Sequence, residues 1–292
     1  MAEPYVDIIR INQIVVIESL GPHDRKLARD MALDVNFEIA EQPIKASFEL
    51  CDGVKSFQRH IAELVARTTA NRALPLLHIE CHGDEDEGLV FTDSSTLPWV
   101  DLWDLLRPLN IAMKNRLVVV LATCVSFSSI TSVSLTCPAP CFFLIAPTKR
   151  VWPDELYSAF KEFYSLLSLG DAEKAMTTLV NRQYQEGKML PVSAGEWFSA
   201  LMTSFLNDYA DKKGLRAAAL DLATRAKADG LTHFDLRYWK RHIKSTLPNR
   251  LNGYFNTFFM LDKFPRDRPR FSREQEQLDR MIAKLGYPPS KR

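Results

Sequence analysis

Residues 76–124 read LLHIECHGDEDEGLVFTDSSTLPWVDLWDLLRPLNIAMKNRLVVVLATC, and this stretch decides the fold. One apolar run in it ends at His82 and Gly83, and a second, Leu117–Leu121, ends just before Cys124. Both runs are rich in Val, Leu and Ile, are too short for buried helices, and are separated by a helix-length connection. This pattern indicates adjacent buried strands of a parallel sheet. Since functional groups lie at the carboxyl ends of such strands, we expect an imidazole and a thiol to meet there.

The bulk composition is that of a folded globular protein. The chain has 292 residues, 46% hydrophobic and 25% charged, with a formal net charge of +1. The small net charge argues against a general attraction to nucleic acid. The amino-terminal sequence MAEPYVDIIRINQ lacks a secretory pattern, and no apolar run reaches membrane-spanning length. We therefore predict a cytoplasmic protein with no membrane partner.

Strand and helix patterns alternate along the first part of the chain, and helix patterns alone follow. Outside the opening stretch, the expected elements include a helix over Val54–Thr68 and strands in the second half of Ile8–Ser19, at Val35–Ala40, at Ile44–Leu50 and at Cys141–Ala146. Beyond Gly187 the strand signals stop. We predict an α/β domain over residues 1–187 and an appended helical region over residues 188–292.

The cysteines do not form a disulfide or metal pattern. There are five of them, an odd number in a chain without an export signal: Cys51, Cys81, Cys124, Cys137 and Cys141. The last two stand in a Cys-Pro-Ala-Pro-Cys sequence, but no second Cys/His pair completes a four-ligand set. We predict no metal and no cofactor.

Cys124 and His82 have the chemistry of a nucleophile and its base. A thiol has an ordinary pKa of about 8.5, and a nearby imidazole can activate it and later protonate a leaving amine. Gly83 has no Cβ, so its N–H can approach a substrate carbonyl and, with the N–H of Cys124, form an oxyanion hole. Alone, the thiol would be a buried structural group and the imidazole a satisfied histidine. Their placement at two strand ends favours a catalytic dyad.

Two other side chains near the dyad are expected to be structural. His78 lies four residues before His82 in the same strand and therefore on the same face, but lower in the sheet. Cys81 directly precedes His82 and faces the opposite side of the sheet. We therefore expect Cys81 to be a core residue rather than the nucleophile.

Residues after each strand end are candidates for the substrate pocket. Asp84 opens an acidic loop that either is a solvated turn or rims the site and favours a basic substrate. Ser126 lies in the Ser/Thr-rich segment Val125–Thr136, which is either a substrate-site loop or an ordinary connection. Both residues are predicted at the pocket.

The carboxyl-terminal region interleaves cations with aromatic residues. Arg237, Lys240, Arg241 and Trp239 are the candidate ligand-binding residues there. The pattern is compatible with binding a small phosphorylated ligand, a partner protein or, less readily, nucleic acid. The alternative is that the aromatic residues form a core while the cations are solvated, because aromatics at helical spacing are usually buried.

These motifs together resemble the CHAT family of caspase-like cysteine peptidases. The resemblance covers Ile8 to Tyr184 and rests on HIECHG, on the strand ending in ATC, and on VWPDELYSAFKEFYSLLSLGDAEKAM. The matching positions are His82, Gly83, Cys124, Val151, Asp154, Phe160, Phe163, Tyr164, Leu167 and Gly170.

The resemblance implies an α/β three-layer sandwich with a mostly parallel central sheet, followed here by the helical region. It implies a Cys–His dyad that cleaves a protein substrate. Related peptidases that cut after Arg or Lys often carry an Asp where this chain has Ala122. The resemblance also implies a residue that recognises the substrate side chain at the end of the first strand, where Glu18 is the candidate for selecting a basic side chain.

Bacterial relatives of this type look like effectors of anti-phage or stress systems, which implies a switch. A partner protein or a nucleotide-derived messenger acting on the carboxyl-terminal region would provide it. Two other functions are open: an inactive caspase-like scaffold that binds a protein, nucleotide or nucleic acid, and cysteine acyl transfer other than proteolysis.

Overall fold

The computed structural model describes residues 11–27, 29–30, 44–124, 126–148, 150, 152–171, 174–178, 189–210, 212–228 and 235–284. The strand expected at Val35–Ala40 lies outside these residues. The chain divides into two compact units. We call residues 1–133 and 139–194 the sheet unit, and residues 134–138 and 195–292 the helical unit.

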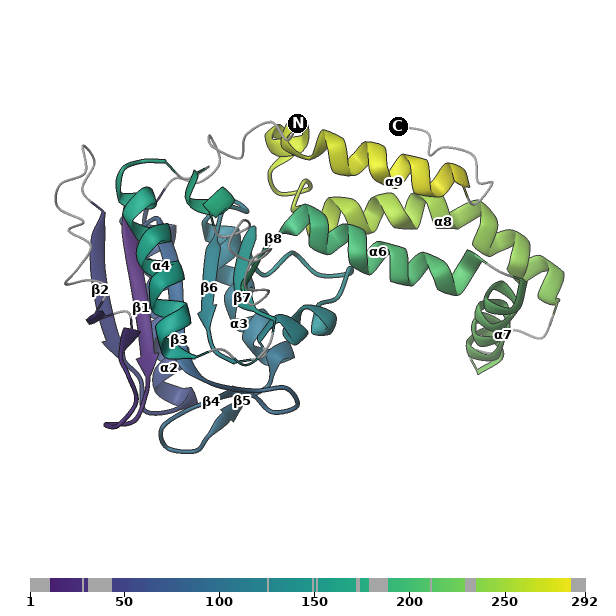
Figure 1. The fold of residues 1–292 in the computed structure, drawn as a ribbon. Helices are drawn as coiled ribbons and strands as arrows, with labels where there is room; N and C mark the ends of the chain where they lie inside the picture. Colours follow the sequence, from purple (N-terminus) through teal and green to yellow (C-terminus); the bar gives the residue numbers. More distant parts are fainter. Residues whose placement is uncertain are drawn as a thin grey trace. The chain divides into compact units, whose positions relative to one another are not determined.

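A mostly parallel sheet forms the centre of the sheet unit (Figure 1). Its strand order is β2-β1-β3-β6-β7-β8. The bounds are Gln13–Ser19 for β1, Lys45–Leu50 for β2, Pro75–Asp84 for β3, Val118–Ala122 for β6, Phe143–Pro147 for β7 and Met189–Ser193 for β8. The first five pair in parallel, and β8 runs antiparallel to β7. The predicted α/β class is confirmed.

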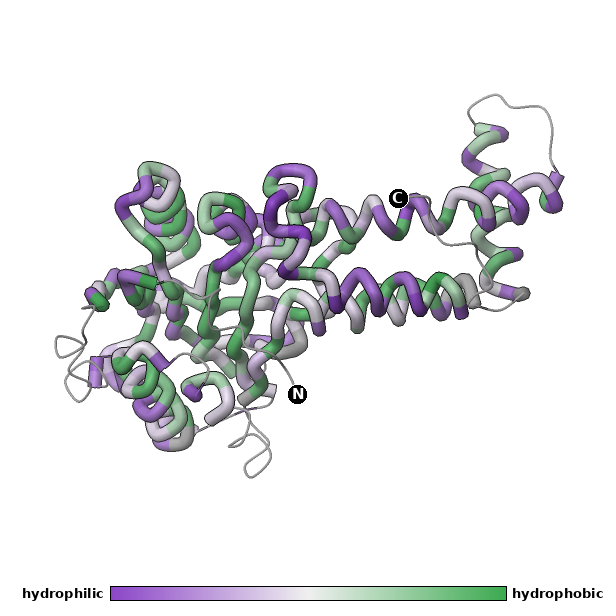
Figure 2. Tube along the Cα trace, turned by 90° about the horizontal axis from the view of Figure 1, so that it is seen from above, coloured by the Kyte–Doolittle hydropathy of each residue, from purple (hydrophilic) through white to green (hydrophobic). Residues whose placement is uncertain are grey.

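Helices cover both faces of this sheet, which gives three layers. Helix α4 (Pro153–Ser168) lies on one face, and α2 (Val54–Thr69) and α3 (Trp99–Ala112) pack together on the other (Figure 1). The strands are apolar because both faces are covered: every residue of β6 is buried, and Figure 2 shows the strands in the hydrophobic colour. Helix α2 buries Phe57, Ile61 and Leu64 at helical spacing.

Strand β3 continues past the parallel sheet into a hairpin. Its last parallel partner on β6 is Ala122, which pairs with Glu80, and its last on β1 is Ser19, which pairs with Cys81. From His82 to Asp84 it pairs antiparallel with β4 (Gly88–Val90), which in turn pairs with β5 (Thr96–Leu97). The expectation that the strand ends at His82 is therefore wrong. His82 lies where β3 leaves one sheet and enters the hairpin.

The sheet unit extends further along the chain than the predicted boundary at residue 187. Strand β8 supplies the antiparallel edge of the sheet, and the sheet unit ends at Ala194. The strand was missed because MLPVS is short and contains Pro191, so nothing local distinguishes it from a loop. Its pairing with β7 is a contact between distant parts of the chain.

The helical unit contains α6 (Ala194–Ala210), α7 (Lys212–Ala228), α8 (Leu236–Phe258), a 3-10 helix at Pro265–Phe271 and α9 (Ser272–Lys284). Its aromatic core joins Phe198 to Phe255, Phe258 and Phe259, with ring centroids 5.1–5.5 Å apart. These phenylalanines are buried, as the core alternative predicts. Within the described residues, no helix is long and apolar enough to cross a membrane.

Candidate active site

Adjacent strands bring His82 and Cys124 to the same edge of the sheet. Glu80 of β3 pairs with Ala122 of β6, and this is the last pair that joins these two strands. His82 and Cys124 each follow this pair by two residues. Because parallel strands share one carboxyl edge, both side chains come from that edge, as predicted.

Gly83 packs directly against the backbone that carries Cys124. A Cβ built on Gly83 would lie 2.6 Å from the carbonyl oxygen of Cys124 and 3.2 Å from the Cβ of Thr123. A contact of 2.6 Å is far inside van der Waals separation, so only glycine allows the two segments to approach this closely. The structure therefore requires glycine beside Cys124.

A cavity of about 390 Å³ opens at this edge of the sheet. Its wall includes His82, Gly83 and Cys124, with Leu27 and Leu156 among the apolar lining. This volume lies within the range of small-ligand and substrate pockets. The predicted dyad thus borders a cavity that can admit a side chain of a substrate.

The exposure of the cysteines separates Cys124 from the buried thiols. Cys51, Cys81 and Cys141 are buried, and burial raises the pKa of each thiol. Cys81 also borders the cavity, but its thiol is held in the protonated form, so it is the core residue that was expected. Cys124 borders the same cavity and is partly exposed. Of these two thiols, Cys124 is the better placed to react.

The imidazole of His82 is largely exposed and bound to a carboxylate. Its side chain is 63% exposed, and its Nε2 lies 3.1 Å from Oδ2 of Asp24. Asp24 follows β1, and its Oδ2 also accepts the backbone N–H of Gly21 at 2.8 Å. This backbone hydrogen bond, with help from His82, lowers the pKa of Asp24. The sequence does not single out Asp24, because its only local signal is a position just after the first strand.

Glu18 does not line the cavity. Its buried carboxylate is ion-paired with Lys26 at 3.2 Å and with Arg29 at 2.8 Å. The negative charge proposed to select a basic substrate is thus matched by two cations of the same chain. The buried carboxylate that does border the cavity is Glu80, whose Oε1 accepts the backbone N–H of Leu27 at 2.8 Å.

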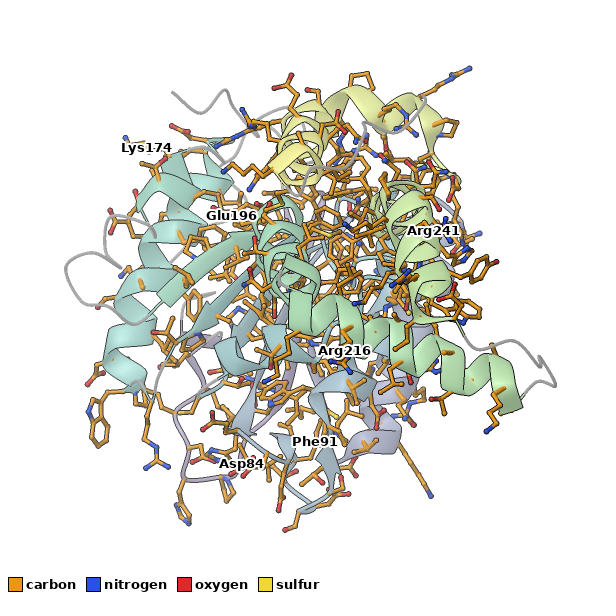
Figure 3. All side chains as sticks on the ribbon, turned by 90° about the vertical axis from the view of Figure 1, so that its right-hand side faces the viewer. Asp84, Phe91, Lys174, Glu196, Arg216 and Arg241 are labelled. Atoms are coloured by element: carbon orange, nitrogen blue, oxygen red, sulfur yellow. The ribbon has the colours of Figure 1, made fainter. Side chains whose placement is uncertain are left out.

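Asp84 and Ser126 organise the backbone next to the site rather than line the cavity. Asp84, labelled in Figure 3, accepts the N–H groups of Asp86 and Glu87 at 2.9 Å each, and these bonds lower its pKa. This is the geometry of a solvated turn. Ser126 is buried at the start of a 3-10 helix (Ser126–Ser132), and its hydroxyl donates to the carbonyl of Thr123 at 2.9 Å. This bond joins the start of the 3-10 helix to the residue before Cys124.

His78 is structural, as predicted. It is fully buried, and its Nδ1 lies 2.7 Å from the hydroxyl of Tyr164 on α4. Its ring also contacts Phe160 with centroids 5.3 Å apart. Burial lowers the pKa of His78 to about 3, so the ring is neutral at physiological pH. Phe160 and Tyr164, two positions of the family resemblance, thus attach α4 to β3.

The candidate ligand-binding residues lie on α8 of the helical unit. Arg237 and Arg241 are exposed, and Lys240 is half-buried (Figure 3 labels Arg241). Trp239 instead packs against a cluster that contains Leu215 and Ile243. The indole therefore contributes to the contact between α7 and α8.

No protein-family model and no curated protein matches the chain. In the part of the chain that the structure describes, no group of three or more His, Cys, Asp or Glu residues is placed to hold a metal ion. The functional class therefore has to be argued from the fold and from the cavity at the carboxyl edge of the sheet.

Proposed function

We propose that this protein is a caspase-like cysteine endopeptidase of the CHAT type, with Cys124 as nucleophile and His82 as general base. The observation that carries the proposal is the close packing of Gly83 on the backbone of Cys124, at the wall of a cavity that His82 also lines. The three-layer sandwich supports it, because the two residues follow neighbouring central strands.

The residues perform recognisable steps of peptide hydrolysis. His82 takes the proton of the Cys124 thiol, and the thiolate attacks the carbonyl carbon of the scissile bond. The N–H groups of Gly83 and Cys124 stabilise the oxyanion that forms. His82 then protonates the departing amine, which leaves a thioester on Cys124. Water hydrolyses the thioester, with His82 as base, and releases the new carboxyl terminus.

The test is cleavage of a fluorogenic peptide library, followed by proteomic identification of new amino termini. We expect Cys124→Ala and His82→Ala to abolish cleavage. Cys137→Ala and His60→Ala are the matched controls, since Cys137 is also partly exposed and His60 lies on α2. Cleavage that survives Cys124→Ala would refute the dyad.

The proposal includes a switch on the helical unit and a cytoplasmic location. Arg237, Lys240, Arg241 and Lys244 recur at helical spacing along one side of α8, and no ion pair of theirs is present in the described part of the chain. Such a basic stripe fits an anionic nucleotide messenger or an acidic partner protein. We expect a messenger of this class to raise the melting temperature, and Arg237→Ala with Arg241→Ala to remove the effect.

The second candidate is an inactive scaffold, and one observation favours it. In the described structure the imidazole of His82 is hydrogen-bonded to Asp24 and not to the thiol of Cys124. A scaffold would bind messengers or partners through α8 without cleaving any peptide. The same library assay, run with and without messengers, separates the two functions. Acyl transfer would appear there as products in which the acyl group passes from the Cys124 thioester to an added amine instead of to water.

A further inference from the structure

We infer that Asp24 is a positioning residue that holds the His82 imidazole with Nε2 protonated and Nδ1 available to Cys124. The inference rests on the proposed function, because it concerns the base of the same dyad. Asp24 is then the third member of the site, beside His82 and Cys124. Asp24 comes from the segment after β1, whereas His82 is on β3 and Cys124 follows β6.

The carboxylate of Asp24 is held in place by its own turn. Oδ2 accepts the backbone N–H of Gly21 at 2.8 Å, and the backbone N–H of Asp24 donates to the carbonyl of Gly21 at 3.2 Å. The same Oδ2 meets Nε2 of His82 at 3.1 Å. Because the turn directly follows β1, the position of this oxygen is fixed relative to the sheet.

The segment that carries Asp24 is also anchored to buried groups of the sheet. Lys26 and Arg29 both pair with the carboxylate of Glu18 on β1, at 3.2 Å and 2.8 Å. The backbone N–H of Leu27 donates to the carboxylate of Glu80 on β3 at 2.8 Å. Two buried carboxylates from neighbouring strands thus hold the residues that follow Asp24.

A third anchor attaches the same segment to helix α4. Arg25 forms an ion pair with Asp154, and its guanidinium lies over the ring of Tyr157 at 4.8 Å from the centroid. The residues that follow Asp24 are therefore held by β1, β3 and α4. A carboxylate held this firmly can orient an exposed imidazole that has little packing of its own.

The ionisation state of the Asp24 carboxyl group determines which ring nitrogen of His82 carries the proton. The Gly21 hydrogen bond favours the ionised form of Asp24, and an ionised carboxylate can only accept hydrogen bonds. Nε2 must therefore be the protonated nitrogen of a neutral His82 ring, which leaves Nδ1 as the basic one. The charged and titratable groups that share the cavity with His82 are Asp24, Arg25, Glu80, Cys81, Cys124 and Arg150.

The experiment measures how fast iodoacetamide alkylates Cys124 at neutral pH. We expect Asp24→Asn to slow alkylation about tenfold and to lower kcat with little change in KM, because the imidazole loses its orientation. Asp30→Asn is the matched control, since Asp30 pairs with Arg25 on the same segment but does not contact His82. It should leave the rate unchanged. Equal melting temperatures of the parent and the variants exclude a folding defect.

A double-variant cycle and a spectroscopic measurement distinguish positioning from a structural role. In a His82→Ala background, Asp24→Asn should have no further effect on alkylation. Nitrogen-15 NMR of the neutral His82 ring should show protonated Nε2 in the parent and a mixture of tautomers in Asp24→Asn.

Protonated Nδ1 in the parent, or an equal effect of Asp24→Asn with and without His82, would overturn the inference. The proposed function fails separately, if peptides are not cleaved while the tautomer changes as stated.

Discussion

The carboxyl edge of the sheet and the core of the helical unit both gather residues from distant parts of the chain, but they differ in chemistry. At the edge, His82, Cys124 and Asp24 surround a cavity and keep contact with solvent. In the helical unit, Phe198 and Phe255 meet in a fully buried core. Changes at the edge should alter reactivity, whereas changes in the helical core should alter stability.

The buried polar groups of the sheet unit explain this difference. Glu18 and Glu80 are buried at the edge, and each is matched by cations or backbone N–H groups of the segment after β1. Buried carboxylates are costly unless they are paired, so they fix the geometry around them. The phenylalanines of the helical unit impose no such directional requirement.

The largest expected effect is on the stability of the helical unit. Phe255→Ala should cost about 3–5 kcal/mol, because the ring is fully buried and its removal leaves a cavity beside Phe198 and Phe259. Hydrogen exchange of the α8 amides measures the loss. Tyr238→Ala is the control on the same helix, since that side chain is 52% exposed, and should change stability by no more than about 0.5 kcal/mol. If Phe255→Ala lost as little stability as Tyr238→Ala, the assignment of Phe255 to the core of the helical unit would be contradicted.

At the edge of the sheet, Gly83→Ala should mainly remove activity. The new Cβ would lie 2.6 Å from the carbonyl oxygen of Cys124, so the two segments must separate. We expect kcat/KM for peptide cleavage to fall about a hundredfold, as when one oxyanion donor is lost. Gly253→Ala on α8 is the control, because apart from its chain neighbours and the adjacent backbone of its own helix no atom lies within 4 Å of its built Cβ. Full activity in Gly83→Ala would remove the main support for the site.

The part of this arrangement that follows from local patterns could be predicted from the sequence. The apolar runs of β3 and β6 are local, and the rule that parallel strands share a carboxyl edge brings His82 and Cys124 together. The amphipathic spacing of Phe57, Ile61 and Leu64 likewise predicted helix α2.

The remaining part depends on contacts between distant segments. Strand β8 exists only because Met189–Ser193 pairs with β7, and its proline gives the opposite local signal. The bond from Asp24 to His82 and the pairing of Glu18 with Arg29 require the segment after β1 to fold back over the sheet. No periodicity encodes that path. The helical spacing of the aromatic residues of α8 does predict their burial, but it does not identify their partner Phe198 on α6.

A moderate effect is expected when the pH is lowered. The pKa of His78 falls from 6.5 to about 3 on folding, so below pH 6.5 the unfolded chain binds a proton that the folded sheet unit excludes. Stability contributed by the neutral ring is therefore lost as the pH falls, by up to about 1.4 kcal/mol per pH unit. Hydrogen exchange of β3 between pH 6.5 and 5 measures the slope, which His78→Gln should flatten.

In the helical unit, Glu274 should make stability depend on pH with a sign opposite to that of His78. Burial raises the pKa of Glu274, so the stability that its protonated form contributes is present at low pH and is lost as the pH rises. Glu274→Gln should therefore stabilise α9 at neutral pH and have less effect in acid. If the stabilities of β3 and α9 changed equally with pH, His78 and Glu274 would not be the groups that control the pH dependence of stability.

The smallest expected effect is that of Tyr164→Phe, which tests whether His78 and His82 on β3 act independently. Tyr164→Phe removes the hydroxyl 2.7 Å from Nδ1 of His78, and an unsatisfied buried nitrogen should cost about 1–2 kcal/mol in urea unfolding. Alkylation of Cys124 should be unchanged, because His78 lies four residues below His82 and contacts α4 instead of the cavity. Asp24→Asn should do the reverse and slow alkylation at nearly constant stability. If Tyr164→Phe also slowed alkylation of Cys124, the Tyr164–His78 and Asp24–His82 hydrogen bonds would be energetically coupled. The site would then include His78 as well as His82.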